Sequence, residues 1–243
     1  MRLDRWLVTL GIGSRKDVQR LVRSGAVAVN GQMEKDPGKL TDEKTARLNV
    51  SGSEVDGRLM RHVMLHKPAG LLTAARDKKQ PTIMDLLPEV YQSIGCMPVG
   101  RLDKDTTGLL LLTCDGELNH RLLSPQRHVD KVYIARVDGP LDASHVDAFA
   151  RGLDLGDFTA DGALLEILTS SPGEATAKVT VHEGKFHQIK RMFEAVGRTV
   201  TQLHRERFGP LVLDEALPVG QWRELTEDEI AALYRDACME EAK

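Results

Sequence analysis

The chain has 243 residues, of which 41% are hydrophobic and 28% charged, and its formal net charge is -3 at pH 7. This composition is typical of a folded globular protein and excludes a disordered or fibrous chain. No apolar run approaches the roughly eighteen residues that a transmembrane helix needs, and the charged N-terminus lacks the apolar core of a signal peptide. We therefore expect a cytoplasmic protein without a membrane partner. The three cysteines, Cys96, Cys114 and Cys238, have no Cys-x-x-Cys spacing, so we expect reduced, buried thiols.

The small net charge hides a strong asymmetry along the chain. Residues 1–35 carry seven Lys/Arg against three acids, and residues 184–208 carry six against two, so each segment has a local charge of +4. The last twenty residues carry seven acids against two bases and offset much of this positive charge. The two basic segments predict two surfaces that can bind a polyanion.

The first fifty residues have the pattern of a small helix-helix-hairpin domain. Apolar residues at positions 3, 6, 7 and 10 predict a short helix that stops at Gly11, and Ser14 is a good N-cap for a second helix that ends at Gly25. One face of this second helix is basic. Asn30-Gly31 is a strong hairpin signal after Val27 and Val29. We therefore predict a domain over residues 1–50, followed by a polar linker over residues 51–60.

From residue 61 the pattern changes to short strands interleaved with helices. The strand-like runs are 62–67, 108–113, 131–138, 163–168, 176–182 and 199–204, and the helical segments are 115–123, 142–150, 186–196 and 227–237. The connections are too short for regular βαβ crossovers. The fold class that we predict is α+β, with a mixed, largely antiparallel sheet and flanking helices over residues 61–243.

The most unusual segment is 100–108, which reads Gly-Arg-Leu-Asp-Lys-Asp-Thr-Thr-Gly. A calcium loop is excluded because its twelfth residue would be a bidentate Glu, whereas Cys114 stands there. The residues alone also allow an interpretation in which these polar residues only shape turns. A functional interpretation is favoured by Arg101, which lies two positions before Asp103 and can hold its carboxylate ionised.

These residues resemble a known family. The segment 100–109 is similar to the signature of the pseudouridine synthases that modify ribosomal RNA, in the branch with an N-terminal S4-type RNA-binding domain. Residues 66–70 resemble the family's opening strand, 131–133 its tyrosine motif and 184–193 its third motif. Residues 203–209 are most similar to the members that act on the small subunit.

The resemblance implies both a reaction and the residues that carry it. Asp103 would be the essential aspartate, Lys190 its cationic partner, Tyr133 the ring that stacks on the uracil, and Arg101 a second nearby cation. The reaction breaks the bond between ribose and the base nitrogen, turns the uracil and rejoins it through a carbon, so no cofactor and no metal is expected. The implied substrate is 16S ribosomal RNA, at uridine 516, within an assembling small-subunit particle, and we expect a monomer.

The basic segments then supply the contacts with RNA. The expected RNA-binding residues are Arg2, Arg5, Ser14, Arg15, Lys16, Gln19, Arg20, Arg23, Lys185, His187, Gln188 and Arg191. The residues alone also allow a structural interpretation, with Tyr133 in a half-buried strand and Lys190 on a solvated helix face. Two alternative functions are a synthase acting on 23S ribosomal RNA and a non-catalytic, ribosome-associated RNA-binding protein.

Overall fold

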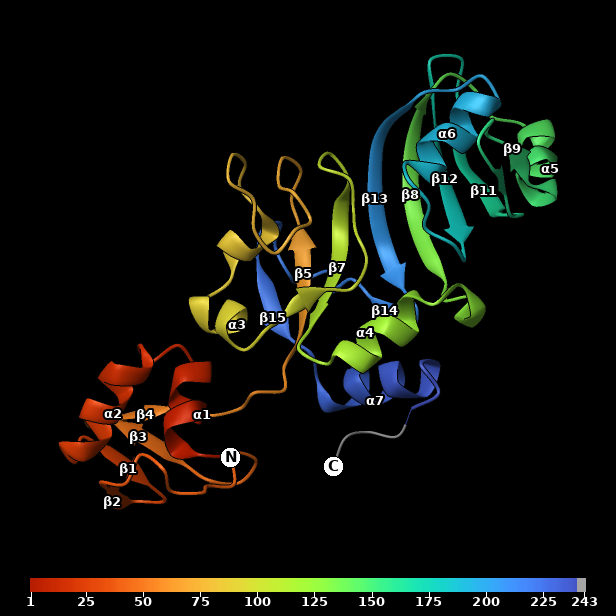
Figure 1. Ribbon diagram of the computed structural model, residues 1–243. Coiled ribbons are helices and arrows are strands. Elements are labelled where there is room, and N and C mark those ends of the chain that lie inside the picture. The colour runs from red at the N-terminus through yellow and green to blue at the C-terminus, as the bar shows by residue number, and fades with distance from the viewer. Residues whose placement is uncertain (240–243) are drawn as a thin grey trace. The chain divides into compact units, whose positions relative to one another are not determined.

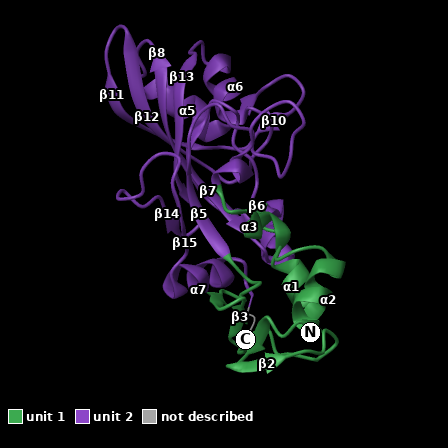
Figure 2. Ribbon diagram, turned by 90° about the vertical axis from the view of Figure 1, so that its left-hand side faces the viewer, with its two compact units in different colours: residues 1–61, 87–97 green, residues 62–86, 98–243 purple. Residues whose placement is uncertain are grey.

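The computed structural model describes residues 1–239, which form two compact units. Of the described residues, the first comprises 1–61 with 87–97, and the second comprises 62–86 with 98–239 (Figure 2). No helix between residues 1 and 239 combines the length and apolarity needed to cross a bilayer.

The first unit begins with two helices, as the pattern of its residues predicts, and continues into a four-stranded antiparallel sheet where the pattern predicted a single hairpin. The helices are α1 (Leu3–Thr9) and α2 (Arg15–Arg23), and the strands, in the order β2-β1-β3-β4, are β1 (Val27–Val29), β2 (Gln32–Glu34), β3 (Leu48–Val50) and β4 (Ser53–Val55). Ser14 caps α2 by accepting a hydrogen bond from the backbone N–H of Asp17, and Asn30 and Gly31 both have positive φ in the tight β1–β2 turn. The buried core is built around Trp6, whose indole N–H donates to the carbonyl of Gly57 at 2.9 Å.

The expected linker over residues 51–60 is wrong for its first half. Residues 53–55 form β4, which pairs with β3 through a tight turn at Ser51 and Gly52, both with positive φ. The polar composition of this stretch reflects an exposed hairpin, because turn residues and edge strands are polar for the same reason that linkers are. The first unit also takes in α3 (Glu89–Ser93), which the sequence pattern did not predict.

The second unit is built on a mixed sheet, with most neighbouring strands antiparallel (Figure 1). In the order β11-β12-β8-β13-β7-β5-β15, the strands are β11 (Leu164–Ser170), β12 (Glu174–Val181), β8 (Lys131–Asp138), β13 (Val200–Phe208), β7 (Thr107–Thr113), β5 (His62–Lys67) and β15 (Trp222–Glu224). Only the β13–β7 pair on this path is parallel. The short elements are η1 (Ile83–Leu86), β6 (Met97–Pro98), η2 (Pro125–Arg127), β9 (Leu153–Asp154), β10 (Thr159–Ala160) and β14 (Leu211–Val212).

Four helices flank this sheet at the places that the sequence predicts. They are α4 (Gly116–Leu123), α5 (Ala143–Arg151), α6 (Gln188–Ala195) and α7 (Glu227–Asp236). In one core cluster, Leu118 of α4 and Leu233 of α7 pack with Leu109 and Leu111 of β7. Figure 1 shows α5 and α6 beside the other half of the sheet, near β11, β12 and β13. The expectation of three buried thiols holds only for Cys96, since Cys114 is partly exposed and Cys238 is exposed.

The parallel junction between β7 and β13 requires a glycine. Gly108 lies opposite Arg205 with φ +104°, and a Cβ atom built on it would be 2.2 Å from the Arg205 carbonyl oxygen. No side chain fits in that space, and the opposing atoms belong to the backbone, which cannot swing aside. The two halves of the sheet therefore meet at Gly108, directly after the loop with the predicted catalytic aspartate.

Candidate active site

The backbone of the loop that precedes β7 is bound by one buried lysine. Lys67, the last residue of β5, has no exposed surface, and its ammonium donates to the carbonyls of Pro68, Asp103, Lys104 and Thr106 at 3.0 to 3.2 Å. Burial lowers the pKa of Lys67 to about 8, although the carboxylates of Asp103 and Asp105 oppose that shift. The sequence interpretation missed this role. Its signal was a lysine at the end of a strand whose centre, residues 63–65, is apolar.

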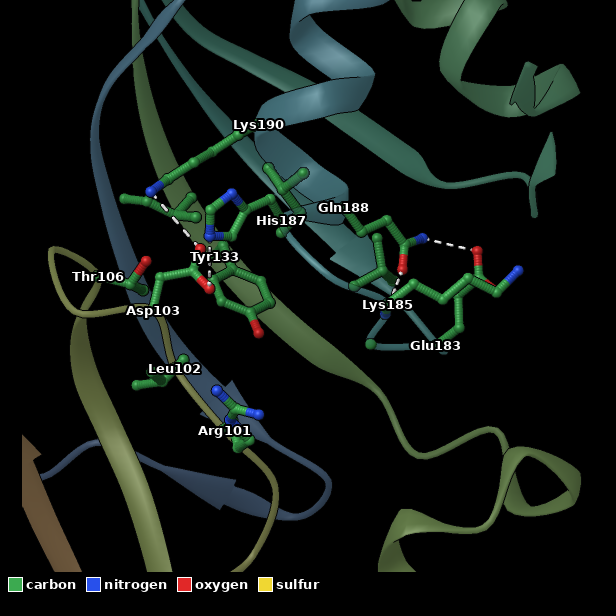
Figure 3. A pocket seen from close by; sticks show the side chains of 14 residues that line it. Arg101, Leu102, Asp103, Thr106, Tyr133, Glu183, Lys185, His187, Gln188 and Lys190 are labelled. Carbon is green, nitrogen blue, oxygen red and sulfur yellow. Dashed lines mark hydrogen bonds and ion pairs between the residues drawn. The ribbon is translucent and has the colours of Figure 1, made fainter. Parts of the chain in front are cut away.

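A second contact fixes the residue before Asp103. The Thr73 hydroxyl donates to the Leu102 carbonyl at 2.8 Å and accepts from the Leu102 N–H at 3.2 Å. Both residues are buried. Because the backbone is bound on either side of Asp103, its carboxylate has a defined direction and points into the adjacent pocket (Figure 3).

Two side chains approach this carboxylate, Lys190 from α6 and His187 from the N-cap position that precedes α6. The Lys190 ammonium is 3.5 Å from Asp103 Oδ2, and the His187 Nε2 atom is 3.5 Å from Asp103 Oδ1 (Figure 3). Lys190 lies closer to Asp105, to whose two oxygens it donates at 2.6 and 2.8 Å, and this hydrogen bond lowers the Asp105 pKa. Lys190 is thus shared between two carboxylates, and His187, which we expected among the RNA-binding residues, also faces Asp103.

Tyr133 forms the flat wall of the same pocket. It lies on β8, where its neighbours in the sheet are Val179 on β12 and Arg205 on β13, and it is 8% exposed. Figure 3 shows its ring beside Asp103, with the hydroxyl directed away from that carboxylate. An aromatic face at this place can stack on a nucleobase that enters the pocket.

Arg101 lines the pocket but does not pair with Asp103. Among residues 1–239, the ion pairs of Asp103 are with His187 and Lys190, and Figure 3 shows Arg101 on the other side of Leu102. The expectation that Arg101 holds the carboxylate ionised is therefore wrong, because residues 101–103 are not a regular strand that turns both side chains the same way. Arg101 therefore contributes to the wall of the pocket without contacting the carboxylate.

The loop before α6 is braced by Gln188. This side chain is only 4% exposed: its amide nitrogen donates to Glu183 at 2.7 Å, and its oxygen accepts from the Lys185 N–H at 3.0 Å. Gln188 thus has no free face for RNA, contrary to the sequence expectation. His187 has φ 51°, an unusual backbone conformation for a residue other than glycine. The braced loop maintains that strain and directs the imidazole toward Asp103.

The second basic segment contributes fewer surface charges than its sequence indicates. Arg205 is 1% exposed, donates from Nε to the Leu109 carbonyl at 2.7 Å and lies over the Phe208 ring. Arg191 pairs with Asp157 and donates to the Leu155 carbonyl. Lys185 pairs with Glu183 at 2.9 Å yet remains exposed. Only part of this segment is thus available to a polyanion.

In the first unit, most of the expected RNA-binding residues are exposed, but the side chains of Arg2, Gln19 and Arg20 bind carboxylates of the same unit. Arg2 and Gln19 both bind the buried Asp4 carboxylate, whose pKa the Arg2 hydrogen bond lowers to about 2. Arg20 pairs with Asp17 at 2.6 Å. The remaining expected residues are exposed: Arg5, Ser14, Arg15, Lys16 and Arg23. The basic face of α2 is therefore accessible, with Gln19 serving the fold.

Comparison with known proteins decides the family. Residues 61–195 match the RNA pseudouridylate synthase family model, and residues 1–43 match the S4 domain model. This chain belongs to the RNA pseudouridylate synthase family. It is 42% identical to an uncharacterized RNA pseudouridine synthase of Bacillus subtilis, over 96% of this chain and 98% of that protein. It is also 42% identical to the ribosomal small subunit pseudouridine synthase A of Pseudomonas aeruginosa, over 96% of this chain and all of that protein.

A solved structure supports the same assignment. The crystal structure of a pseudouridylate synthase superposes with a TM-score of 0.66 at 33% identity and covers 96% of this chain and 99% of that one. The predicted α+β fold with an N-terminal S4 domain is thereby confirmed, and the chain is an RNA pseudouridine synthase. The alternative of a non-catalytic binding protein has no support in a chain that carries the whole synthase.

Proposed function

We propose that this synthase converts one uridine of 16S ribosomal RNA, at position 516 by the resemblance of its motifs, into pseudouridine while the small-subunit particle is assembling. The Pseudomonas aeruginosa relative and a Vibrio cholerae relative, 38% identical over 97% of this chain, are both named ribosomal small subunit pseudouridine synthase A. The observation that carries the chemistry is the Asp103 carboxylate in an open pocket, between the Tyr133 ring and the side chains of Lys190 and His187.

The reaction needs few groups, and the pocket supplies them. The bond between ribose C1′ and the uracil N1 breaks, the ring turns, and a bond forms between C1′ and C5. The hydrogen on C5 leaves as a proton, while N1 gains one. Atoms and electrons balance without a donor or an oxidant. In this proposal, the Asp103 carboxylate acts on the sugar as nucleophile or base, and Lys190 and His187 keep negative charge favourable there.

The geometry also requires the target base to leave its stack. A pocket that ends at Asp103 can act on a uridine only when that nucleotide is extruded, which costs least in a loop or a distorted stem. The exposed cations of α2 then contribute phosphate contacts that place the RNA but take no part in the chemistry. One basic domain and one pocket favour a single site over many.

The test is to map new pseudouridines in defined RNAs. Purified enzyme and the Asp103→Asn variant are offered equal amounts of 16S and 23S transcripts, with and without small-subunit proteins, and carbodiimide-dependent primer-extension stops are read along both RNAs. We expect one stop, on 16S RNA, strongest with the proteins present. Asp103→Asn should give none while it still binds RNA, because an amide keeps the shape of the carboxyl but provides neither nucleophile nor base.

Two results would contradict this proposal. Modification of 23S RNA with none on any form of 16S RNA would overturn the substrate. Easily measured turnover by Asp103→Asn, above a contaminant-free background, would overturn the assignment of the carboxylate, while the family membership stands.

A further inference from the structure

Among the Phe, Tyr and Trp rings of residues 1–239, Phe186 is the one that is exposed. The chain has five Phe, three Tyr and two Trp, all within the described residues, and nine of these rings are buried or half-buried. Phe186, in contrast, is 73% exposed. A single exposed aliphatic residue is ordinary, but a large exposed ring leaves unusually much apolar surface in water. Its position in the chain, between Lys185 and His187 of the pocket, suggests a use for that surface.

One face of the ring is already stacked. The Phe186 and His187 ring centres are 3.8 Å apart with an angle of 17° between the planes. His187 in turn contacts Asp103. The exposed surface of Phe186 is therefore its other side, a flat apolar face one imidazole away from the catalytic carboxylate.

The exposure of Phe186 is not the result of a loose loop. Gln188 binds both Glu183 and the backbone of Lys185, and Glu183 also accepts from the Asp161 N–H at 2.9 Å. The left-handed backbone of His187 follows directly. Such a braced, strained segment fixes the direction of Phe186, and backbone strain of this kind persists where the surroundings enforce it.

The neighbouring charges indicate what Phe186 contacts. Phe186 directly follows Lys185, whose ammonium pairs with Glu183 at 2.9 Å but whose side chain is exposed, and both Lys185 and Lys190 line the pocket that this segment borders. An aromatic face among cations is the usual surface for an unpaired nucleobase and its phosphates. An apolar protein partner would require a contiguous apolar patch.

We infer that Phe186 stacks on an unpaired base of the substrate RNA next to the target uridine. The inference rests on the proposed function, since it assigns a positioning residue for the same substrate. Extruding a uridine exposes the faces of its former neighbours, and a ring fixed at the rim of the pocket can cover one of them. Phe186 thereby stabilises the extruded RNA and lowers KM, whereas the chemical step at Asp103 is left unchanged.

The experiment compares four substitutions at this position. Phe186→Leu keeps an apolar side chain against His187 but has no flat face, and Phe186→Ala removes most of the side chain. Phe186→Tyr and Phe186→Trp keep an aromatic face. On 16S RNA, we expect the Leu and Ala variants to raise KM by about 5- to 150-fold with kcat nearly unchanged, the range that loss of one stacked base produces. The Tyr and Trp variants should stay within about twofold of wild type.

A second measurement reports the stack directly. The fluorescent base 2-aminopurine is placed on either side of the modified uridine. Binding of wild type or Phe186→Trp should quench one of the two positions, and binding of Phe186→Leu should leave both unquenched. The salt dependence of binding should be the same for all variants, because no charge is changed.

The outcomes separate this inference from the proposed function. If Phe186→Leu matches wild type in KM and quenching, the stacking role is refuted. An effect of Phe186→Leu only in the presence of small-subunit proteins would refute it too, since the ring would then contact a protein. If wild type modifies only 23S RNA, the proposed substrate fails, and the same ranking of variants on 23S RNA still decides the role of Phe186.

Discussion

Replacing Lys67 by methionine tests how the loop of Asp103 is held. Methionine keeps the unbranched apolar stem within β5 and removes the ammonium. Four backbone carbonyls, three of them within residues 103–106, lose their common donor. Because Lys67 has no exposed surface, water does not replace that donor without movement of the loop.

The size of the effect follows from two opposing contributions. A hydrogen bond from a charged donor contributes about 1.5 to 3 kcal/mol, and the ammonium has three N–H groups for these four carbonyls, so the bonds together contribute at least about 4 to 5 kcal/mol. Burial of the ammonium costs several kcal/mol, and the lowered pKa of Lys67 is the evidence for that cost. We therefore expect Lys67→Met to lose about 3 kcal/mol of unfolding free energy. A loop displaced by about 1 Å should lower kcat by about a hundredfold.

The pH dependence distinguishes this residue from an ordinary structural one. The Lys67 pKa is 10.5 ordinarily and about 8 in the folded protein, so between these values the unfolded chain binds more protons. The contribution of Lys67 to unfolding free energy therefore rises with pH across that window. Activity should move the opposite way, because the neutral amine loses a donor and its charge, and kcat should fall above about pH 8.

The measurement is kcat by carbodiimide mapping and thermal unfolding, each from pH 6.5 to 10. Lys131→Met is the matched control: this buried lysine also has a pKa of about 8, but its ammonium donates to the carbonyls of Val129 and His182. The alkaline fall in kcat should persist in Lys131→Met and disappear in Lys67→Met. If Lys67→Met has the wild-type kcat, or if its kcat still falls at alkaline pH, the proposed role of Lys67 in holding the Asp103 loop is refuted.

Three further substitutions test the site, the RNA contacts and the sheet junction. Lys190→Met should raise the pKa of Asp105, because the cation that lowers it is gone, and should reduce turnover at pH 7 by about a hundredfold. The pKa is measured by NMR titration of the carboxyl groups, and an unchanged Asp105 pKa would contradict the pairing. Arg15→Ala should reduce the slope of log binding constant against log salt by about one, with kcat unchanged, and an identical slope would mean that α2 faces away from the RNA. Gly108→Ala should lower the free energy of unfolding, measured by thermal denaturation, by about 3 kcal/mol or more, because the new Cβ atom meets backbone atoms. Gly31→Ala, which has open space around it, should lower it by about 1 kcal/mol, and equal losses in the two variants would refute the steric reasoning.

The sequence predicted the elements of this fold well where the signals were local. The run 131–138 and the helix near 227–237 agree with β8 and α7 within a residue, because strand alternation and a capped amphipathic helix are written in neighbouring residues. The short strand β15 was missed because Trp222–Glu224 is too short to show alternation, and it is defined by its pairing with β5. The hairpin of β4 was mistaken for a linker because polar composition does not distinguish the two.

The candidate site was predicted as a set of residues, but its contacts were not. The motifs brought Asp103, Tyr133 and Lys190 to one pocket, as their resemblance implies. The sharing of Lys190 between two carboxylates and the burial of Arg205 depend on residues about one hundred positions apart in the chain. The spacing of neighbouring residues does not predict such distant contacts, so the charged residues of the segment 184–208 were all interpreted as surface residues.

The position of the site follows from the parallel junction in the sheet. Antiparallel neighbours can be joined by tight turns, but β7 and β13 run parallel, so the loop that enters β7 at Thr107 lies beside the middle of β13 and is open to side chains from both halves. From one half, Lys67 at the end of β5 binds the backbone of this loop; from the other, α6 supplies Lys190 and β8 supplies Tyr133. The glycine at the junction lets the β7 and β13 backbones approach closely, and the loop with Asp103, whose carboxylate is 3.5 Å from the Lys190 ammonium, directly precedes it. A change at the junction should therefore reduce catalysis even when every side chain of the pocket is kept.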